Sequence, residues 1–339
     1  MKDDFFGQSD IARLQRSWTS EETQDYLRAL PIWAGPVELE QKAGGLTNRT
    51  YFATDSGGKR YAVRCGFDRY RERQPTVVHC TLAAHKLGLG PALRYWEPNI
   101  TITDFIHKPR MTEEQFGKPA MIAHIVERLR ALHAGSDAVA ETISYWWVFH
   151  SVRRYLHQLE NGLARNDFTP SPWADEASFF HRVTDTLERV MRPFIPVLTH
   201  NCVTYVNLMF DDHDQVLFID WDGGGFGNPK FDLATMSMWL DADEELDRYV
   251  LGCYFGDVDD EEMNELLREH RASKTMEAVR LITETMVALL DPYYYLRPEE
   301  VSRSMAEFFP GGQARYEGLI DFVRPLFEKN WATYRKVYG

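Results

Sequence analysis

Two polar stretches in the second half of the chain carry side chains suited to phosphate or metal chemistry. They span residues 199–207 and 219–222, about a dozen residues apart. Asn207, at the end of the first stretch, offers an amide oxygen, and Asp220 in the second offers a carboxylate oxygen. Oxygen ligands from two neighbouring segments suit Mg2+, which takes its remaining ligands from water and phosphate. Aspartate after a strand and asparagine in a loop are also ordinary turn residues, so both interpretations stay open on residue type alone.

A glycine-rich turn in the first half of the chain could approach a phosphate group closely. It consists of Gly44, Gly45, Leu46, Thr47 and Asn48. Glycine lets backbone N–H groups come close to an anion, and the Thr47 and Asn48 side chains add further donors. A pair of glycines between two strands is also an ordinary hairpin turn. Arg64, at the end of a later strand, could bind phosphate oxygens or could be a surface arginine.

Short strands and one helix surround this turn and predict a small mixed sheet domain. Alternating residues and turn-rich breaks predict strands over residues 37–41, 49–54, 60–64, 92–97 and 100–106. A helix is expected over residues 71–87, where Gly88 and Gly90 end it. A polar helical segment is expected within residues 1–30, with a start signal at residues 20–22.

Helices dominate from Met111 onward. Apolar residues at helical spacing predict a core-facing stripe within residues 121–132. Further helices are expected over residues 144–163, 173–192, 231–255, 259–289 and 312–337. Residues 197–231 interrupt them with a polar loop, two short strands (208–210 and 216–219) and a run of three glycines. Such a loop inside a helical lobe is a typical place for a functional site.

The bulk composition excludes several classes of protein. The chain has 339 residues, more than one core usually serves, so two lobes are expected. Its formal net charge of -13 leaves no basic excess for binding nucleic acid. Residues 1–10 lack the apolar region of a secretory signal, and no apolar run is long enough to span a membrane. Its four cysteines form no CxxC pair, which argues against a zinc site or disulfide framework and fits a reducing cytoplasm.

Several segments share the order and spacing of one known family. They are Leu30-Pro31-Ile32-Trp33, the glycine-rich turn, Tyr61-Ala62-Val63-Arg64, Gly88-Leu89-Gly90-Pro91, residues 200–207, Phe218-Ile219-Asp220-Trp221-Asp222, Asn228-Pro229 and Phe231-Asp232-Leu233-Ala234. Over residues 30–335 the chain resembles the bacterial choline/ethanolamine kinase-like family, which is related to the aminoglycoside phosphotransferases.

The resemblance implies an α+β fold with the two lobes of a protein kinase. Residues 1–34 would be an N-terminal helical extension. Residues 35–107 would form a nucleotide-binding N-lobe, with a small mixed β-sheet and one main helix. Residues 108–339 would form a larger, mostly helical C-lobe. The C-lobe would contain a catalytic loop at 199–207 and a metal motif at 218–222.

The resemblance also implies the cofactors and the role of each site residue. ATP and Mg2+ would bind between the lobes, with the glycine-rich turn over the phosphates. Arg64 would be the strand cation, which is lysine in protein kinases. Asn207 and Asp220 would be the Mg2+ ligands. Asp222 would be a second acid near the metal, and Asp232 would brace the catalytic loop.

The implied substrate is a small amino alcohol, whose cationic nitrogen such enzymes hold among aromatic and acidic side chains. Candidates for the aromatic side chains are Tyr145, Trp146, Trp147, Trp239, Tyr293, Tyr294 and Trp331. Most aromatic residues at helical spacing belong to a core, so the sequence does not decide which of them line a pocket. The acidic composition would suit a cationic ligand, although it more often only keeps a protein soluble.

The sequence departs from the family pattern at the residue that does the chemistry. The family's catalytic loop reads His-Asn-Asp, whereas this chain has His200-Asn201-Cys202. The missing aspartate orients the substrate hydroxyl and accepts its proton, a contribution of typically ~10²–10⁴ in rate. A thiol has an ordinary pKa of ~8.5 against ~3.9 for aspartate, so it is a poor base at neutral pH. The helix glutamate that faces the strand cation is expected at Val77, which would be a second departure.

Two hypotheses for function follow. In the first, the protein is an ATP- and Mg2+-dependent phosphotransferase that works weakly or through a substitute base such as Asp222. In the second, it is a pseudokinase that binds ligands or regulates, or an enzyme that does other chemistry through Cys202. His200 would then be the base for a Cys202 nucleophile, although a lone cysteine is more often a packed small side chain.

Overall fold

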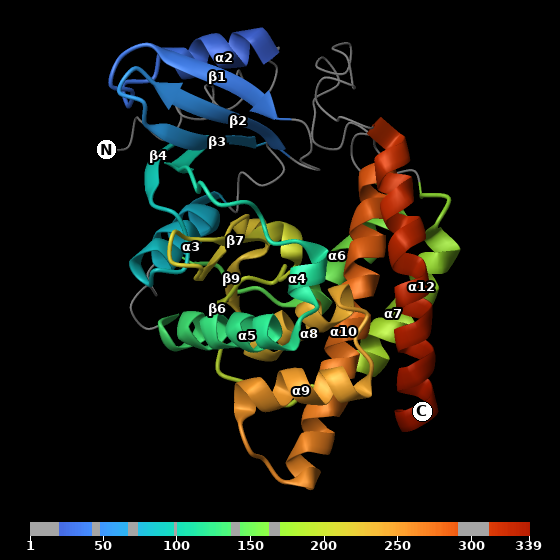
Figure 1. Cartoon of the computed structure of the whole chain (residues 1–339). Helices are drawn as coiled ribbons and strands as arrows, with labels where there is room; N and C mark the ends of the chain where they lie inside the picture. The colour runs from blue at the N-terminus through green and yellow to red at the C-terminus, as the bar shows by residue number, and fades with distance from the viewer. Residues whose placement is uncertain are drawn as a thin grey trace.

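The protein folds into two lobes, which Figure 1 shows one above the other. The computed structural model describes residues 20–42, 48–66, 74–97, 100–136, 143–162, 170–290 and 312–339. The main sheet lies in the first lobe and most helices in the second, so the expected α+β architecture is confirmed. None of the helices in these ranges has the length and apolarity needed to cross a membrane.

The N-lobe is built on a five-stranded antiparallel sheet with the order β1-β2-β3-β5-β4. Its strands are β1 (Val37–Lys42), β2 (Asn48–Asp55), β3 (Arg60–Gly66), β4 (Leu93–Glu97) and β5 (Ile100–Asp104). Each strand expected from the sequence is present, which confirms those predictions. The strand that carries Arg64, β3, is the central one.

The two faces of this sheet have different neighbours. Helix α2 (Ser20–Arg28) covers one face, where Leu27 shares a buried cluster with Tyr51 and Val63. Leu27 therefore joins the N-lobe core, although it lies within the segment 1–34 expected as an extension. Successive side chains of a strand alternate between faces, so Arg64 points to the opposite face, toward the C-lobe.

Helix α3 (Gln74–Lys86) connects N-lobe strands in sequence but is built into the C-lobe core. Val77, Cys80 and Ala84 belong to the same buried cluster as the C-lobe residue Phe218. The Thr76 hydroxyl also donates to the Ser144 hydroxyl over 2.8 Å. The position of α3 is therefore fixed by the C-lobe and not by the N-lobe sheet alone.

The C-lobe consists mainly of helices. They are α4 (Glu113–Phe116), α5 (Pro119–Ala134), α6 (Val148–Asn161), α7 (Ala174–Glu188), α8 (Pro229–Trp239), α9 (Glu244–Phe255), α10 (Asp260–Leu290) and α12 (Gly312–Tyr338). The apolar stripe predicted for residues 121–132 is buried along α5, as expected. Figure 1 shows α10 and α12 side by side along one edge of the lobe, where they pack together.

The prediction of one helix over residues 231–255 is wrong, because α8 ends at Trp239 and α9 begins at Glu244. Asp241, between them, has a left-handed φ of 47°. The Asp243 side chain caps α9 by accepting from the Leu246 N–H over 3.0 Å. Aspartate competes with the helix for backbone donors and so favours such a break.

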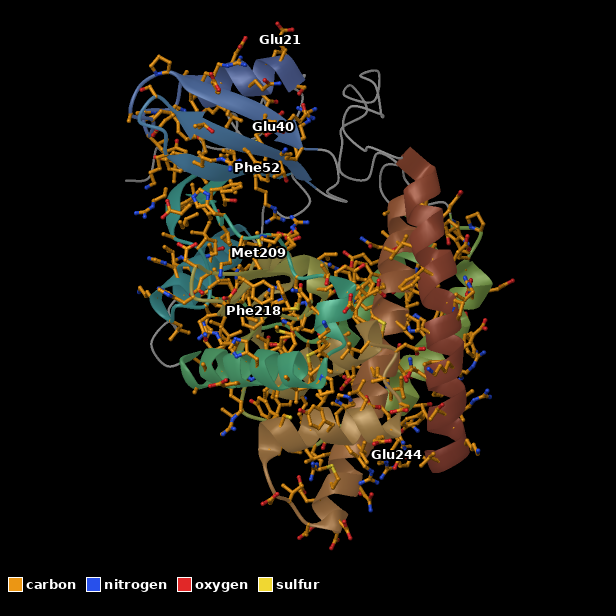
Figure 2. All side chains as sticks on the ribbon, viewed as in Figure 1. Glu21, Glu40, Phe52, Met209, Phe218 and Glu244 are labelled. Carbon is orange, nitrogen blue, oxygen red and sulfur yellow. The ribbon has the colours of Figure 1, made fainter. Side chains whose placement is uncertain are left out.

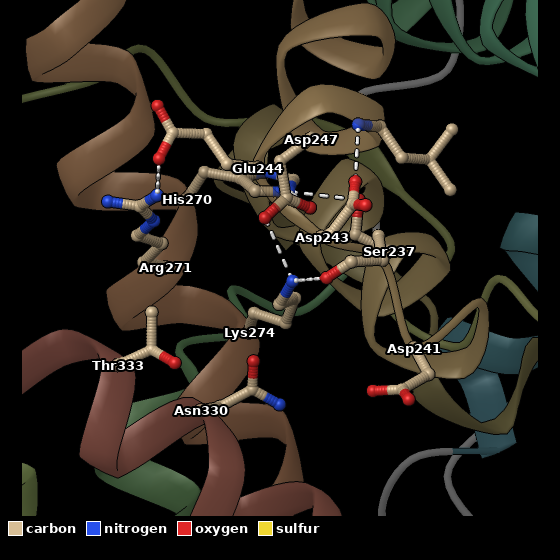
Figure 3. Close-up of polar contacts among 12 residues, drawn as sticks. Ser237, Asp241, Asp243, Glu244, Asp247, His270, Arg271, Lys274, Asn330 and Thr333 are labelled. Carbon is tan, nitrogen blue, oxygen red and sulfur yellow. Dashed lines mark hydrogen bonds and ion pairs between the residues drawn. The ribbon is translucent and has the colours of Figure 1, made fainter.

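A buried polar network joins α8, α9 and α10 (Figure 3). The Lys274 ammonium donates to Asp247 over 2.8 Å, and His270 Nε2 lies 3.2 Å from Asp247 and 2.9 Å from the Ser237 hydroxyl. Burial opposes ionisation of Asp247, but His270 and Lys274 together lower its pKa to about 2. Burial also lowers the pKa of Lys274, against the attraction of Asp247. This network fixes the helices behind the loops described next.

Candidate active site

Two short antiparallel ladders position the polar loops of the C-lobe. Strand β6 (Val197–Thr199) pairs with β9 (Gly225–Gly227), and β7 (Leu208–Phe210) pairs with β8 (Val216–Phe218). The loop 199–207 leaves β6 and enters β7, and the loop 219–224 leaves β8 and enters β9. The two ladders therefore hold both loops side by side. Figure 2 labels Met209 and Phe218 on the second ladder, in the C-lobe below the N-lobe sheet.

Asp232, on α8, holds the first loop in place. Its carboxylate accepts from the backbone N–H of His200 over 2.9 Å and from that of Asn201 over 2.5 Å. His133 Nε2 lies 3.0 Å from the same carboxylate, whose side chain is fully buried. Three polar contacts on one buried carboxylate leave the loop little freedom, in keeping with the bracing role that the family resemblance implies.

Each loop contains a residue with a left-handed backbone conformation. Asn201 has a φ of 60° and Asp220 a φ of 65°, a conformation that asparagine and aspartate adopt more readily than most residues. The Asn201 amide group donates to the Thr199 hydroxyl over 2.8 Å and to the Gly223 carbonyl over 2.9 Å. Asn201 thus ties one loop to the other, and unusual backbone of this kind gathers at functional sites.

The His200 side chain packs against the second loop. Its ring lies edge-on to Trp221, with centroids 4.7 Å apart, and its Nε2 lies 2.8 Å from the Ile219 carbonyl oxygen. Burial lowers the pKa of His200 below its ordinary value. Because Nε2 is engaged by Ile219, that nitrogen is not available to the Cys202 thiol as a base.

Cys202 is partly buried and follows His200 and Asn201 in the first loop. The Asn207 amide nitrogen donates to the Cys202 carbonyl over 3.1 Å and to its Sγ over 3.3 Å. Burial raises the pKa of Cys202 to about 12. A thiol in this state is protonated at neutral pH, so these surroundings disfavour both a base and a thiolate nucleophile.

An interlobe ion pair joins Arg64 to Asp220 and Asp222. Arg64 Nη2 lies 3.1 Å from Asp220 Oδ1, and the same nitrogen donates a hydrogen bond to Asp222 Oδ2. Desolvation and, less strongly, the Asp222 carboxylate raise the pKa of Asp220 above its ordinary value, and Arg64 opposes the rise. Because 46% of the Asp220 side chain is exposed, water and the neighbouring Arg64 guanidinium both stabilise its ionised form.

Asn207, Asp220 and Asp222 provide oxygen donors of the kind that Mg2+ prefers. Asn207 uses its amide nitrogen on Cys202, so its amide oxygen is directed to the other side, and Asp220 and Asp222 add carboxylates. Within the described ranges, no group of three or more His, Cys, Asp or Glu side chains is arranged to hold a metal. Two carboxylates and one amide oxygen are too few for a closed metal site, but Mg2+ takes its other ligands from phosphate and water.

Comparisons with known proteins place the chain in a family. The profile of the phosphotransferase enzyme family APH matches residues 38–266, well over half of the chain. The chain belongs to this family. Protein LicA of Haemophilus influenzae is 23% identical over 246 residues, which cover 68% of this chain and 67% of LicA.

Solved structures show the same fold as this APH-family chain. An ethanolamine kinase from Plasmodium vivax matches with a TM-score of 0.64 at 16% identity, over 91% of this chain and 96% of that one. A choline/ethanolamine kinase family protein from Mesorhizobium loti matches with a TM-score of 0.59 at 20% identity, over 94% of this chain and 99% of that one. At these identities the likeness establishes the kinase-like fold.

The structure brings together some of the residues predicted for an APH-family site. Arg64, Asp220 and Asp222 make direct contact, and Asn207 contacts Cys202. Gly44, Gly45, Leu46 and Thr47 lie outside the described residues, and of Asn48 only the backbone, in β2, is described. Their predicted role over the phosphates therefore stays a prediction.

Most of the aromatic candidates are used in packing. Trp146 packs against Phe231, Trp147 donates to Glu188, Trp239 stacks on Phe322, and Trp331 stacks on Tyr334. Tyr145 is 59% exposed, and Tyr293 and Tyr294 lie outside the described residues. Of the aromatic candidates that the structure describes, Tyr145 is thus the most open to a ligand.

A charged cluster that sequence reasoning missed lies near Cys202. Arg280 donates twice to Glu277, over 2.7 and 2.8 Å, and once to Glu284, over 2.6 Å. All three α10 residues act electrostatically on the Cys202 thiol. Burial raises the pKa of Glu277, and Arg280 opposes the rise. Opposite charges three and four residues apart are ordinary on exposed helices, so no signal in the sequence marks this cluster as buried.

Proposed function

We propose that the protein is an ATP- and Mg2+-dependent phosphotransferase that acts on a small amino alcohol, with its turnover weakened by Cys202. The observation that carries this proposal is the meeting of Arg64, Asp220 and Asp222 at one point between the lobes. Membership of the APH phosphotransferase family supports the reaction type. The named activities of the two solved relatives support the substrate class.

In this proposal each side chain has one task. The Arg64 guanidinium binds phosphate oxygens of ATP, for which its planar set of donors is suited. Asn207 and Asp220 hold Mg2+, which when bound neutralises charge on the phosphates. Asp232 keeps the loop that carries Asn207 and Cys202 in position.

The proton of the acceptor alcohol needs a base. As the hydroxyl oxygen attacks the terminal phosphorus of ATP, ADP leaves and the hydroxyl proton must pass to the protein or to water. The Cys202 thiol does not accept it at neutral pH, because its pKa is about 12. Asp222 is the candidate substitute, because its carboxylate lies beside Asp220 at the contact with Arg64.

The charged cluster on α10 suits a cationic acceptor. Glu277 and Glu284 bring two carboxyl groups to this cluster, and both contact the Arg280 guanidinium. The three side chains are at most 19% exposed. Carboxyl groups with so little solvent around them can be stabilised by a cation, such as the ammonium group of an amino alcohol.

A second candidate function is ligand binding without phosphotransfer. It is favoured by the neutral thiol at Cys202 and by Val77, a buried apolar residue where the family pattern leads us to expect a glutamate. Both candidates predict nucleotide binding, and turnover separates them.

The test begins with the melting temperature of the protein in the presence of ATP and Mg2+. A ligand that binds only the folded state raises this temperature by mass action. We expect a rise with ATP and Mg2+ together, and Asp220→Ala should remove the Mg2+-dependent part. Release of ADP that depends on choline, ethanolamine or a related amino alcohol supports the phosphotransferase. A rise in melting temperature without such ADP release supports the binding protein, and no rise contradicts both.

A further inference from the structure

Helix α3 carries no acidic side chain over Gln74–Lys86 that could pair with Arg64. Val77 stands where such an acid is expected, and its side chain is 6% exposed in the C-lobe core. The first turn of α3 contains no acidic residue, and none follows up to Lys86. The Thr76–Ser144 hydrogen bond and the close packing of Cys80 against Gly224 hold α3 in this position. Helix α3 therefore offers no carboxylate that could draw Arg64 away from the C-lobe.

Arg64 instead places a positive charge between the two carboxylates of the metal motif. One nitrogen, Nη2, contacts an oxygen of Asp220 and an oxygen of Asp222. Asp220 would hold the metal ion and Asp222 lies beside it, so a cation that contacts both carboxylates stands where the metal would bind. The guanidinium keeps its charge at any pH near neutrality, so a change of pH does not release it from this position.

We propose that Arg64 competes with the divalent cation for Asp220 and Asp222, and that the metal gains access only when nucleotide phosphates take over the guanidinium. The inference rests on the proposed nucleotide site and adds an order of binding to it. Besides binding the phosphates, Arg64 then governs whether the two carboxylates are open to the metal.

Electrostatic repulsion between Arg64 and the metal ion is the reason why nucleotide should favour metal binding. A guanidinium and a divalent cation repel each other when they share the same pair of oxygens, and the repulsion is strong where solvent is partly excluded. Phosphate oxygens offer Arg64 an alternative partner with two parallel hydrogen bonds. Nucleotide should therefore tighten metal binding, and by linkage the metal should tighten nucleotide binding by the same factor.

The experiment measures Mn2+ binding to the protein without nucleotide, by the loss of the free-ion signal in electron paramagnetic resonance. Mn2+ prefers the same oxygen donors as Mg2+. Arg64→Met removes the charge and should tighten Mn2+ binding by about tenfold or more, whereas Arg64→Lys keeps the charge and should stay close to the unchanged protein. Arg94→Met is the matched control, because Arg94 pairs with Asp104 inside the N-lobe. If Arg64→Met does not fold, Arg64→Gln replaces it.

The outcomes separate this inference from the proposed function. Tighter Mn2+ binding in Arg64→Met, with Arg94→Met and Arg64→Lys unchanged, supports the competition. Equal Mn2+ affinity in all proteins, together with retained binding of ATP and Mn2+, overturns the competition and leaves the nucleotide site standing. Absence of Mn2+ binding in every variant, with or without ATP, overturns both.

Discussion

Replacing Cys202 by aspartate should supply the base that the family resemblance leads us to expect at this position. The Asn207 amide nitrogen already points at Sγ over 3.3 Å, so it can donate to an introduced carboxylate at the same place. If the rest of the site works as proposed, Cys202→Asp should raise ADP formation with the correct amino alcohol by about 100-fold, the lower end of what a positioned base contributes.

The same substitution should cost stability, because the surroundings of Cys202 are partly buried and negatively charged. Asp220, Glu277 and Glu284 all raise the pKa of the present thiol, and Arg280 alone lowers it among the charged neighbours that act on it most. If folding raises the pKa of the introduced carboxyl by ~2, the variant loses about 3 kcal/mol of unfolding free energy at neutral pH. A carboxyl whose pKa is higher in the folded state destabilises the protein only at pH values at which the unfolded chain would ionise it. The loss should therefore be absent below pH ~4, about half developed at pH ~5, and complete above pH ~6.

Two assays check this reasoning against a matched control. Cys202→Asn has nearly the same size as the aspartate variant but no charge, so it should gain no turnover and show none of the additional pH dependence. Coupled ADP release measures the first effect, and urea unfolding at several pH values measures the second. Equal turnover in the two variants, or a stability difference between them that does not change with pH, would refute the argument for a positioned carboxylate in a desolvated site.

Four further predictions concern the C-lobe. Lys274→Met leaves the Asp247 carboxylate buried without its ammonium partner and should lower the free energy of unfolding in urea by about 3–5 kcal/mol. Because the folded-state pKa of Asp247 is about 2, its contribution should be present above pH ~4 and be lost as the pH falls toward 2, which acid titration of circular dichroism can follow. Asp232→Asn should cost about 3 kcal/mol and weaken nucleotide binding measured by calorimetry, since it removes the charge that holds the catalytic loop. Iodoacetamide should label Cys202 at least about tenfold more slowly in the folded protein than in urea at mildly alkaline pH, and equal rates would contradict a buried thiol.

Much of the fold follows from short-range patterns in the sequence. Alternation and glycine-rich breaks identified the strands of the N-lobe, and helical spacing identified the buried face of α5, because both patterns record which side of an element meets a core. The break between α8 and α9 was missed, because its signal is the local hydrogen bonding of Asp243 rather than a change in apolar spacing.

The candidate site divides in the same way. The sequence by itself determined the types of the polar residues, their place in two neighbouring loops, and the substitution of the expected aspartate by Cys202. Only the tertiary structure decided that Arg64 meets Asp222, 158 residues further along the chain, and that Glu277 and Arg280 act electrostatically on Cys202. A pattern along the chain reports which residues are buried, but not which distant residues share that burial. Those partners depend on how the two lobes and the long helix α10 pack against one another.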